Sequence, residues 1–200
     1  MAEGLIAKLN RKQFLFTAVI ILFAAVSLIL FFQAAREGIT HYNKSQFAIA
    51  APEHTASAET AVKVPGFELP DINGNTVKLS QFDSADVLIV NIWSAGCPVC
   101  RTEIPSLTEL DRRISLDGDI ILLTIVIADS YSEVSSYFPQ GTNLRILFDG
   151  DDKVGKGIFN TSQYPETFIL DRQRRIRARF DGARPWHSDA LIKYFKSFLH

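Results

Sequence analysis

The longest uninterrupted apolar stretch of the chain lies near its N-terminus, at residues 14–32. It reads FLFTAVIILFAAVSLILFF and contains no charged residue and only two hydroxyls. A helix of about 20 apolar residues spans the hydrocarbon layer of a bilayer, whereas the apolar region of a signal peptide is shorter, about 7–15 residues. The pattern therefore predicts an uncleaved transmembrane anchor; the alternatives are a cleaved signal peptide and a buried core helix.

Basic residues before the apolar stretch predict its orientation. Lys8, Arg11 and Lys12 precede it, and positive charges beside a membrane span stay on the cytoplasmic side. We therefore expect a single pass through the cytoplasmic (inner) membrane with residues 1–13 inside. Everything after residue 32 is then expected in the periplasm or another extracytoplasmic space.

A polar stretch rich in small residues follows the anchor, at residues 33–62. Its segment AIAAPEHTASAETAV shows no helical periodicity. Side chains of this kind cannot bury enough surface to offset the entropy lost on ordering. The stretch is predicted to be a flexible linker, which leaves residues 63–200 as the folded domain.

Strand and helix patterns alternate through the remaining residues. The runs VLIVNI (87–92) and IILLTIVIA (120–128) are typical of strands buried on both faces. The turn signal Asn73-Gly74 predicts a short hairpin. Further strands are expected at 144–148, 167–170 and 175–180, and helices after Cys100 and at 132–138, 154–159 and 188–199. This order predicts an α/β domain whose central mixed sheet is flanked by helices, with parallel strands early and a hairpin at the end.

Composition narrows the class of function. The 200 residues include 21 Lys and Arg against 22 Asp and Glu, a formal net charge of −1. This balance argues against a nucleic-acid partner, which normally requires a basic excess. The 47% hydrophobic content excludes wholesale disorder. Two cysteines cannot build a disulfide scaffold, but they form one closely spaced pair.

That pair, Cys97-Pro98-Val99-Cys100, comes directly after a predicted buried strand and begins a predicted helix. Unpaired backbone N–H groups and the positive end of the helix dipole stabilise a thiolate at such a position. We therefore expect Cys97 to be an exposed nucleophile. Cys100 lies one turn further along and can attack a mixed disulfide formed at Cys97, so the two would form a redox disulfide.

Two other interpretations of the cysteine pair are weaker. A zinc site needs two more ligands, but the chain has no second CxxC, and His187 and His200 show no ligand spacing. A permanent structural disulfide would close too short a loop to stabilise the fold appreciably. We therefore expect redox chemistry without a metal or cofactor.

Several blocks of the sequence resemble a known family. The stretch VLIVNIWSAGCPVCRTEIPSL resembles the active-site strand, loop and helix of thioredoxin-like proteins, especially the membrane-anchored TlpA/ResA-like and DsbE (CcmG)-like thiol–disulfide oxidoreductases. ILFDGD (146–151) resembles the family's central insertion, and YPETFILD (164–171) resembles its cis-proline loop. The resemblance covers residues 64–199 and implies a thioredoxin-like fold with an N-terminal β-extension. The matching active-site residues are Trp93, Cys97, Cys100, Arg101, Glu103 and Pro105.

The sequence departs from the family pattern at two positions beside the cysteines. Gly96 replaces the tryptophan that usually precedes the first cysteine, which removes part of an apolar surface around the nucleophile. Val99 stands where many members have proline. These departures leave the substrate preference and the redox potential open.

The resemblance also implies a substrate-binding surface. A cis Pro165 would face the cysteines, and Tyr164 before it would expose its backbone to pair with a substrate strand. Trp93, just ahead of the cysteine loop, is the third expected substrate-binding residue.

Proton transfer requires a further residue. Cytosolic thioredoxins carry a buried acid where this chain has Asn91, and an amide cannot accept that proton. Glu103 is the nearest acidic candidate, three residues past Cys100 on the same side of the helix. We therefore expect Glu103 to complete the catalytic set with Cys97 and Cys100. The alternative is a carboxylate that only complements the helix dipole.

Taken together, the resemblance implies thiol–disulfide exchange. The expected direction is reduction of disulfides in exported proteins, with apocytochrome c as the substrate class and a membrane reductase as electron donor. An oxidase or isomerase of the same fold is the main alternative. A peroxiredoxin-type peroxidase needs a PxxxTxxC motif, which Val90 and Ser94 do not match. A copper(I)-binding dithiol protein would leave the Pro165 loop without a role.

Overall fold

The computed structural model describes residues 11–115, 118–127, 131–138 and 141–199. The chain divides after residue 46 into two compact units. The first is helical and the second is the α/β domain, and each is described by itself.

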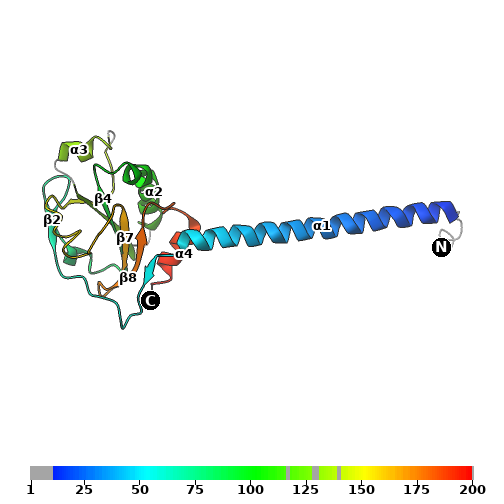
Figure 1. The fold of residues 1–200 in the computed structure, drawn as a ribbon, viewed down its shortest axis with the longest axis horizontal. Coiled ribbons are helices and arrows are strands. Elements are labelled where there is room, and N and C mark those ends of the chain that lie inside the picture. Colours follow the sequence, from blue (N-terminus) through cyan, green and yellow to red (C-terminus); the bar gives the residue numbers. More distant parts are fainter. Residues whose placement is uncertain (1–10, 116–117, 128–130, 139–140, 200) are drawn as a thin grey trace. The chain divides into compact units, whose positions relative to one another are not determined.

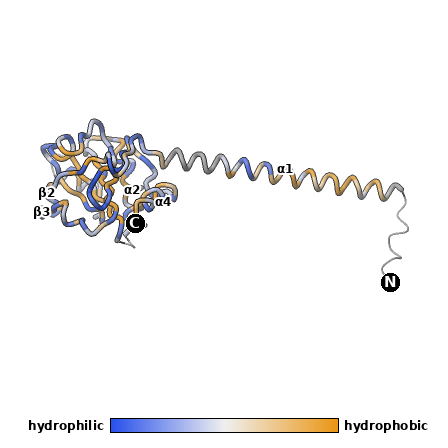
Figure 2. Tube along the Cα trace, turned by 90° about the horizontal axis from the view of Figure 1, so that it is seen from below, coloured by the Kyte–Doolittle hydropathy of each residue, from blue (hydrophilic) through white to orange (hydrophobic). Residues whose placement is uncertain are grey.

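The described part of the N-terminal unit belongs to α1, a 40-residue helix that spans Arg11–Ala50 and whose last four residues fall in the second unit. Its section Phe14–Thr40 is long and apolar enough to cross a membrane, and it is the one such helix in the described part of the chain. Figure 2 shows this apolar section giving way to polar residues further along the helix. The predicted span at residues 14–32 lies within it.

The structure differs from the predicted flexible linker at residues 33–62. α1 continues to Ala50, and a short strand, β1 (His54–Thr55), follows and pairs with the last strand of the domain. Residues 33–50 include several good helix formers. A helix that has already formed in the apolar section extends through them without a second nucleation cost. The segment without helical periodicity, residues 48–62, is helical only in its first three residues, so the prediction differs from the structure mainly at residues 33–50.

The domain is built on a mixed sheet, as predicted, and this sheet has six strands. Figure 1 shows β4, β7 and β8 side by side within it. β4 runs parallel to β5 and antiparallel to β7, β5 runs parallel to β6, and β7 and β8 form the final hairpin. In order across the sheet the strands are β1, β8 (Ile176–Asp181), β7 (Glu166–Leu170), β4 (Val87–Ser94), β5 (Ile120–Ile127) and β6 (Ile146–Phe148).

Short elements and helices complete the domain. The predicted hairpin around Gly74 consists of β2 (Glu68–Pro70) and β3 (Thr76–Lys78), and Gly74 adopts the positive φ that this turn requires. The remaining elements are the 3-10 helix η1 (Leu79–Phe82) and the α-helices α2 (Pro98–Ile114), α3 (Tyr131–Ser135) and α4 (Asp189–Lys196).

Alternation along β4 separates the core into two layers, because successive side chains of a strand point to opposite faces. Val87, Ile89 and Trp93 pack with residues of α2 and α4. Leu88 and the other intervening residues pack on the opposite side with residues of the β2–β3 hairpin and η1. Asn91 has the parity of the α2 side, so this strand directs one polar side chain toward the helix that begins at the cysteine motif.

The predicted helix at residues 154–159 is absent, and turns occupy that stretch. Asp149 provides the physical reason. Its carboxylate accepts hydrogen bonds from the backbone N–H groups of Lys153, Val154 and Gly155 at 3.1, 2.9 and 2.8 Å. These bonds hold the chain in turns, and the backbone leaves the right-handed helical region on either side of the stretch, at Asp152 with a φ of +56° and at Asn160 with a φ of +54°.

Candidate active site

Cys97 occupies the N-cap position of α2. Its backbone is extended, with φ −91° and ψ 110°, and Pro98 takes the first helical position, where a missing N–H costs nothing. The Cys97 Sγ accepts a hydrogen bond from the backbone N–H of Cys100 at 3.2 Å. This is the expected arrangement, in which an unpaired N–H of the first helical turn points at the sulfur and stabilises negative charge on it.

The two cysteines form a disulfide and differ in accessibility. Cys100 is 1% exposed, whereas Cys97 is partly exposed. Beside them on the surface, the side chain of Val99 is 53% exposed. A partner molecule therefore reaches Cys97 before Cys100, which agrees with the order of attack expected from the sequence.

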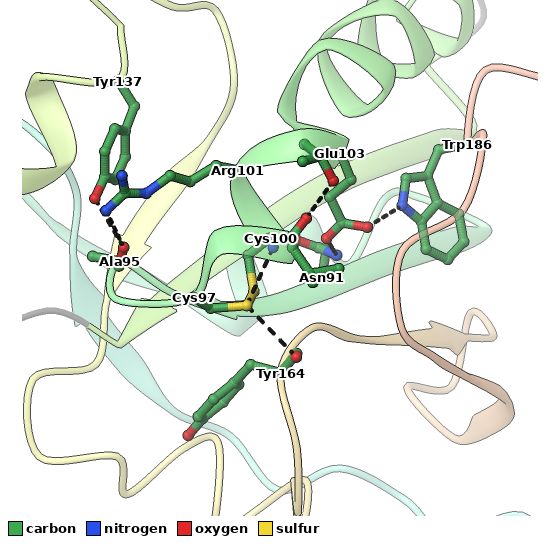
Figure 3. The surroundings of a disulfide bond; sticks show 11 residues. Asn91, Ala95, Cys97, Cys100, Arg101, Glu103, Tyr137, Tyr164 and Trp186 are labelled. Carbon is green, nitrogen blue, oxygen red and sulfur yellow. Dashed lines mark hydrogen bonds between the residues drawn. A yellow bond between two sulfur atoms is a disulfide. The ribbon is translucent and has the colours of Figure 1, made fainter.

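The loop before β7 faces the cysteine pair. The Tyr164–Pro165 peptide bond is cis, as the resemblance implied, and the carbonyl oxygen of Tyr164 lies 3.7 Å from the Sγ of Cys97. Figure 3 shows this carbonyl directed at the sulfur from the opposite side to α2. Residues 67 positions apart in the sequence thus form one site.

The phenol of Tyr164 anchors this loop to the turn at residues 149–157. Its hydroxyl donates a hydrogen bond to Asp152 Oδ2 at 2.7 Å, and Lys156 forms an ion pair with the same oxygen, also at 2.7 Å. Burial, followed by the bond to Asp152, raises the pKa of Tyr164. The hydroxyl therefore remains a protonated donor throughout the physiological range.

Removal of this donor is expected to loosen the loop. Tyr164→Phe should lower the free energy of unfolding by about 1 kcal/mol, the usual net contribution of a hydrogen bond. Urea titration of the detergent-solubilised chain measures this. Tyr131→Phe is the matched control, since the Tyr131 ring stacks on Phe148 with centroids 4.2 Å apart and keeps that contact. Equal effects of the two variants would contradict the anchoring role.

Glu103 lies beneath the cysteine pair, 2% exposed. Its Oε1 accepts a hydrogen bond from Asn91 Nδ2 at 3.0 Å, and its Oε2 accepts one from the indole Nε1 of Trp186 at 2.8 Å. The same Asn91 nitrogen also donates to Thr167 Oγ1 at 2.9 Å. Figure 3 shows the carboxylate between Asn91 and Trp186.

The environment of Glu103 affects its ionisation in two opposing ways. Burial is the largest influence and raises the pKa of Glu103. Hydrogen bonds from Trp186 and Asn91, a backbone hydrogen bond from Arg184 and the Arg184 charge lower the pKa but do not cancel the effect of burial. The raised pKa moves this carboxyl toward the range in which it exchanges protons near neutral pH.

A second polar cluster fixes the loop between β4 and Cys97. The carbonyl oxygen of Ala95 accepts hydrogen bonds from Arg101 at 3.2 Å and from the Tyr137 hydroxyl at 2.8 Å. The guanidinium of Arg101 lies over the Tyr137 ring, 4.5 Å from its centroid. Trp93 packs beside that ring and is 3% exposed.

This burial changes the interpretation of Trp93. We expected it to contact substrate, but its side chain is in the core and supports the loop from beneath. The reason is strand parity, since Trp93 shares the α2-facing side of β4 with Val87 and Ile89. The carbonyl of Tyr164 does lie beside Cys97, and the buried Pro165 follows it through a cis bond, so contact with substrate stays a prediction for these residues.

Comparison with known proteins agrees with this geometry. The AhpC/TSA family model matches residues 60–179, more than half of the chain. The chain belongs to the AhpC/TSA family. The chain is similar to the thiol:disulfide interchange protein DsbE of Escherichia coli K12, with 29% identity over 185 residues, covering 85% of this chain and 88% of that protein.

Two further proteins are similar to this chain. The DsbE protein of Pseudomonas aeruginosa is 27% identical over 136 residues, covering 66% of this chain and 71% of its own. A solved structure from Chlorobium tepidum, described as a thiol:disulfide interchange protein DsbE, superposes with a TM-score of 0.62 at 21% identity and covers 70% of this chain and 97% of its own. This AhpC/TSA family member therefore has the thioredoxin-like fold and is a thiol–disulfide oxidoreductase.

Sequence reasoning missed three contributors to the family site. Trp186 and Arg184 approach Glu103 from a segment 83 and 81 positions away, and no motif marked them. Tyr137 lies in a stretch interpreted only as a short helix. The described residues contain no group of three or more His, Cys, Asp or Glu side chains placed to hold a metal ion.

Proposed function

We propose that the chain is a membrane-anchored, extracytoplasmic protein-disulfide reductase in which Cys97 is the nucleophile and Cys100 the resolving cysteine. The observation that carries the proposal is the pairing of a partly exposed Cys97 at the start of α2 with a fully buried Cys100. The Tyr164 carbonyl beside Cys97 supports it, because a free backbone acceptor there can align an extended substrate segment.

The proposed reaction proceeds in two exchanges. The Cys97 thiolate attacks one sulfur of the substrate disulfide, forms a mixed disulfide and expels the other substrate sulfur as a thiolate. Cys100 then passes its proton to Glu103 and attacks Cys97 Sγ, which releases the second substrate thiolate. The substrate gains two electrons and two protons overall, and the Cys97–Cys100 disulfide forms. A membrane dithiol donor must then reduce that disulfide.

The buried carboxylate favours reduction as the direction of exchange. A thioredoxin-like protein is a strong oxidant when its reduced, thiolate form is well stabilised. Glu103 lies one helical turn from Cys100, so its negative charge opposes a thiolate at Cys100. Cys100 therefore stays a neutral thiol and gives the reduced form no second stabilised thiolate, so the pair is expected to be a weaker oxidant and a better electron donor.

The substrate class is proposed to be exported proteins with closely spaced cysteines, apocytochrome c in particular. The DsbE names of the relatives and the Cys-x-x-Cys-His haem-attachment pattern support this. The test compares two oxidised peptides, one with that pattern and one whose cysteines lie further apart. Faster reduction of the first by the reduced chain supports the proposal. Consumption of hydrogen peroxide without peptide reduction would instead indicate a peroxidase.

The location of the domain is a separate prediction. Because Lys8, Arg11 and Lys12 precede the apolar helix, the cysteines are expected outside the cytoplasm. A membrane-impermeant thiol reagent should label the reduced protein in cells with a permeabilised outer envelope and an intact inner membrane. The Cys97→Ala/Cys100→Ala double variant gives the background. Labelling that appears only after complete lysis would contradict this topology.

A further inference from the structure

The segment Asp181–Trp186, between β8 and α4, contacts both halves of the site. The Trp186 indole donates to Glu103 at 2.8 Å, and Arg184 lies close enough to that carboxylate to lower its pKa. The backbone N–H of Gly182 donates to the carbonyl oxygen of Pro165 at 2.8 Å. The position of this one segment therefore affects the proton acceptor and the cis-proline loop together.

Glu53 holds the same segment from outside the site. Its Oε2 accepts a hydrogen bond from the backbone N–H of Asp181 at 2.9 Å, and its Oε1 is paired with the guanidinium of Arg184. The two carboxylate oxygens of Glu53 thus bind the first and the last residue of the four-residue stretch 181–184. Gly182, within that stretch, has a φ of +79°, so the turn depends on a backbone conformation that few residues adopt.

The place of Glu53 in the chain makes this contact notable. It lies between the end of α1 at Ala50 and the start of β1 at His54. The residue is thus on the connection between the apolar helix and the domain, far in sequence from the residues it holds. β1 keeps this connection in place by pairing with β8.

We propose that Glu53 is a positioning residue for Glu103, which fixes the Asp181–Trp186 segment so that the Trp186 indole donates to the Glu103 carboxylate and Arg184 stays near it. The proposal rests on the proton-accepting role of Glu103 in the proposed function. It means that a residue between α1 and β1 influences the ionisation of Glu103.

The groups around Glu103 determine the expected consequence. Asn91 faces it from β4, Trp186 and the charged Arg184 face it from the C-terminal segment, and Cys100 lies on its own helix. If the segment loosens, Glu103 stays buried but loses donors, so its pKa rises further. Removing the Glu53 charge without moving the segment would have the opposite effect, because one nearby negative charge fewer lowers the pKa of Glu103.

Two substitutions separate position from charge. Glu53→Gln removes the negative charge and replaces the ion pair with Arg184 by a weaker hydrogen bond. Glu53→Asp keeps the charge but is one methylene shorter, so it cannot reach Asp181 and Arg184 at once. Glu59→Gln is the matched control, since it removes a carboxylate from an exposed site a few residues further along.

The experiment uses the full-length chain in detergent. The reduced protein is mixed with a peptide that contains one disulfide, and the single-turnover rate of peptide reduction is recorded across pH. In the pH–rate profile, the rate falls at low pH as Glu103 becomes protonated. Both Glu53 variants should raise the apparent pKa of this fall by about half to one unit, so peptide reduction should be about three- to tenfold slower below that pKa. Glu59→Gln should leave the profile unchanged. The melting temperature should fall by about 4 °C or less, since partly exposed ion pairs add little stability.

The outcomes are distinct. An unchanged or lowered apparent pKa in Glu53→Asp would overturn the positioning role, and so would a pKa shift that persists in a Glu53→Asp/Glu103→Gln double variant. If Glu103→Gln alone leaves the profile of the wild-type chain intact, the failure lies in the proposed role of Glu103. If no variant reduces the peptide at any pH and neither does the wild type, the proposed reductase function itself is wrong.

Discussion

Cys100→Ala is expected to accumulate mixed disulfides with its substrates, whereas Cys97→Ala accumulates few and loses disulfide reduction down to the uncatalysed rate. Cys97 is partly exposed at the N-terminus of α2, where the Cys100 N–H points at its sulfur, so it is the cysteine that substrates reach. Cys100 is 1% exposed and can attack only the neighbouring Cys97 sulfur. Without it, the first exchange has no second step.

The measurement is non-reducing electrophoresis of each variant after acid quenching of thiols in the cell, followed by detection of the chain. The Cys97→Ala/Cys100→Ala double variant supplies the background. Equal trapping by the two single variants, or stronger trapping by Cys97→Ala, would contradict the assignment of nucleophile and resolving cysteine.

The second large effect is expected for Glu103→Gln. The amide cannot accept the Cys100 proton, so release of the substrate should slow by about a hundredfold near neutral pH, a typical contribution of general base catalysis. The fall in rate at low pH, which reflects protonation of Glu103, should also disappear from the pH–rate profile. Glu109→Gln is the control, since it removes a carboxylate from the same helix that is paired with Arg112 at the surface. An unchanged profile in Glu103→Gln would leave Glu103 with a structural role only, as the acceptor that holds Asn91 and Trp186.

Glu103 also predicts how stability depends on pH. Its pKa is raised in the folded chain, chiefly by burial, so the folded state binds the Glu103 proton more tightly than the unfolded state does. The stabilising contribution of that proton is complete below the ordinary glutamate pKa and is lost as pH rises through the raised pKa. Denaturant titrations of the wild-type chain should show this decline, and Glu103→Gln should lack it. The same slope in both proteins would contradict the assignment.

How far the sequence predicts this molecule depends on how local the determining interactions are. β4 and the start of α2 were predictable because a run such as VLIVNI and a cysteine before Pro98 indicate their own structure. Glu103 was predictable because it lies one turn from Cys100. Its partner Trp186 was not, since it is 83 positions away and only the fold brings the two together. The two-residue strand β1 likewise exists only because β8 offers an edge to pair with.

Other misjudged features have equally specific causes. Residues 154–159 have apolar spacing that fits a helix, but the Asp149 carboxylate takes up the backbone donors at their start. Trp93 fits a family position associated with substrate, yet the parity of β4 places it in the core. The Asp149 bonds span only four to six residues, and the parity of β4 follows from the order of its own residues, so both features were local to the sequence and the patterns were misjudged.

The reduction potential of the Cys97–Cys100 pair tests the central claim most directly. The full-length chain in detergent is equilibrated with thiol–disulfide buffers of known potential, quenched with acid and assayed for the fraction of free cysteines. The account predicts a reducing pair, below about −200 mV, because the Glu103 carboxylate disfavours the thiolate at Cys100. A potential near about −120 mV, that of a strong dithiol oxidant, would contradict the reductase assignment and indicate electron flow in the opposite direction.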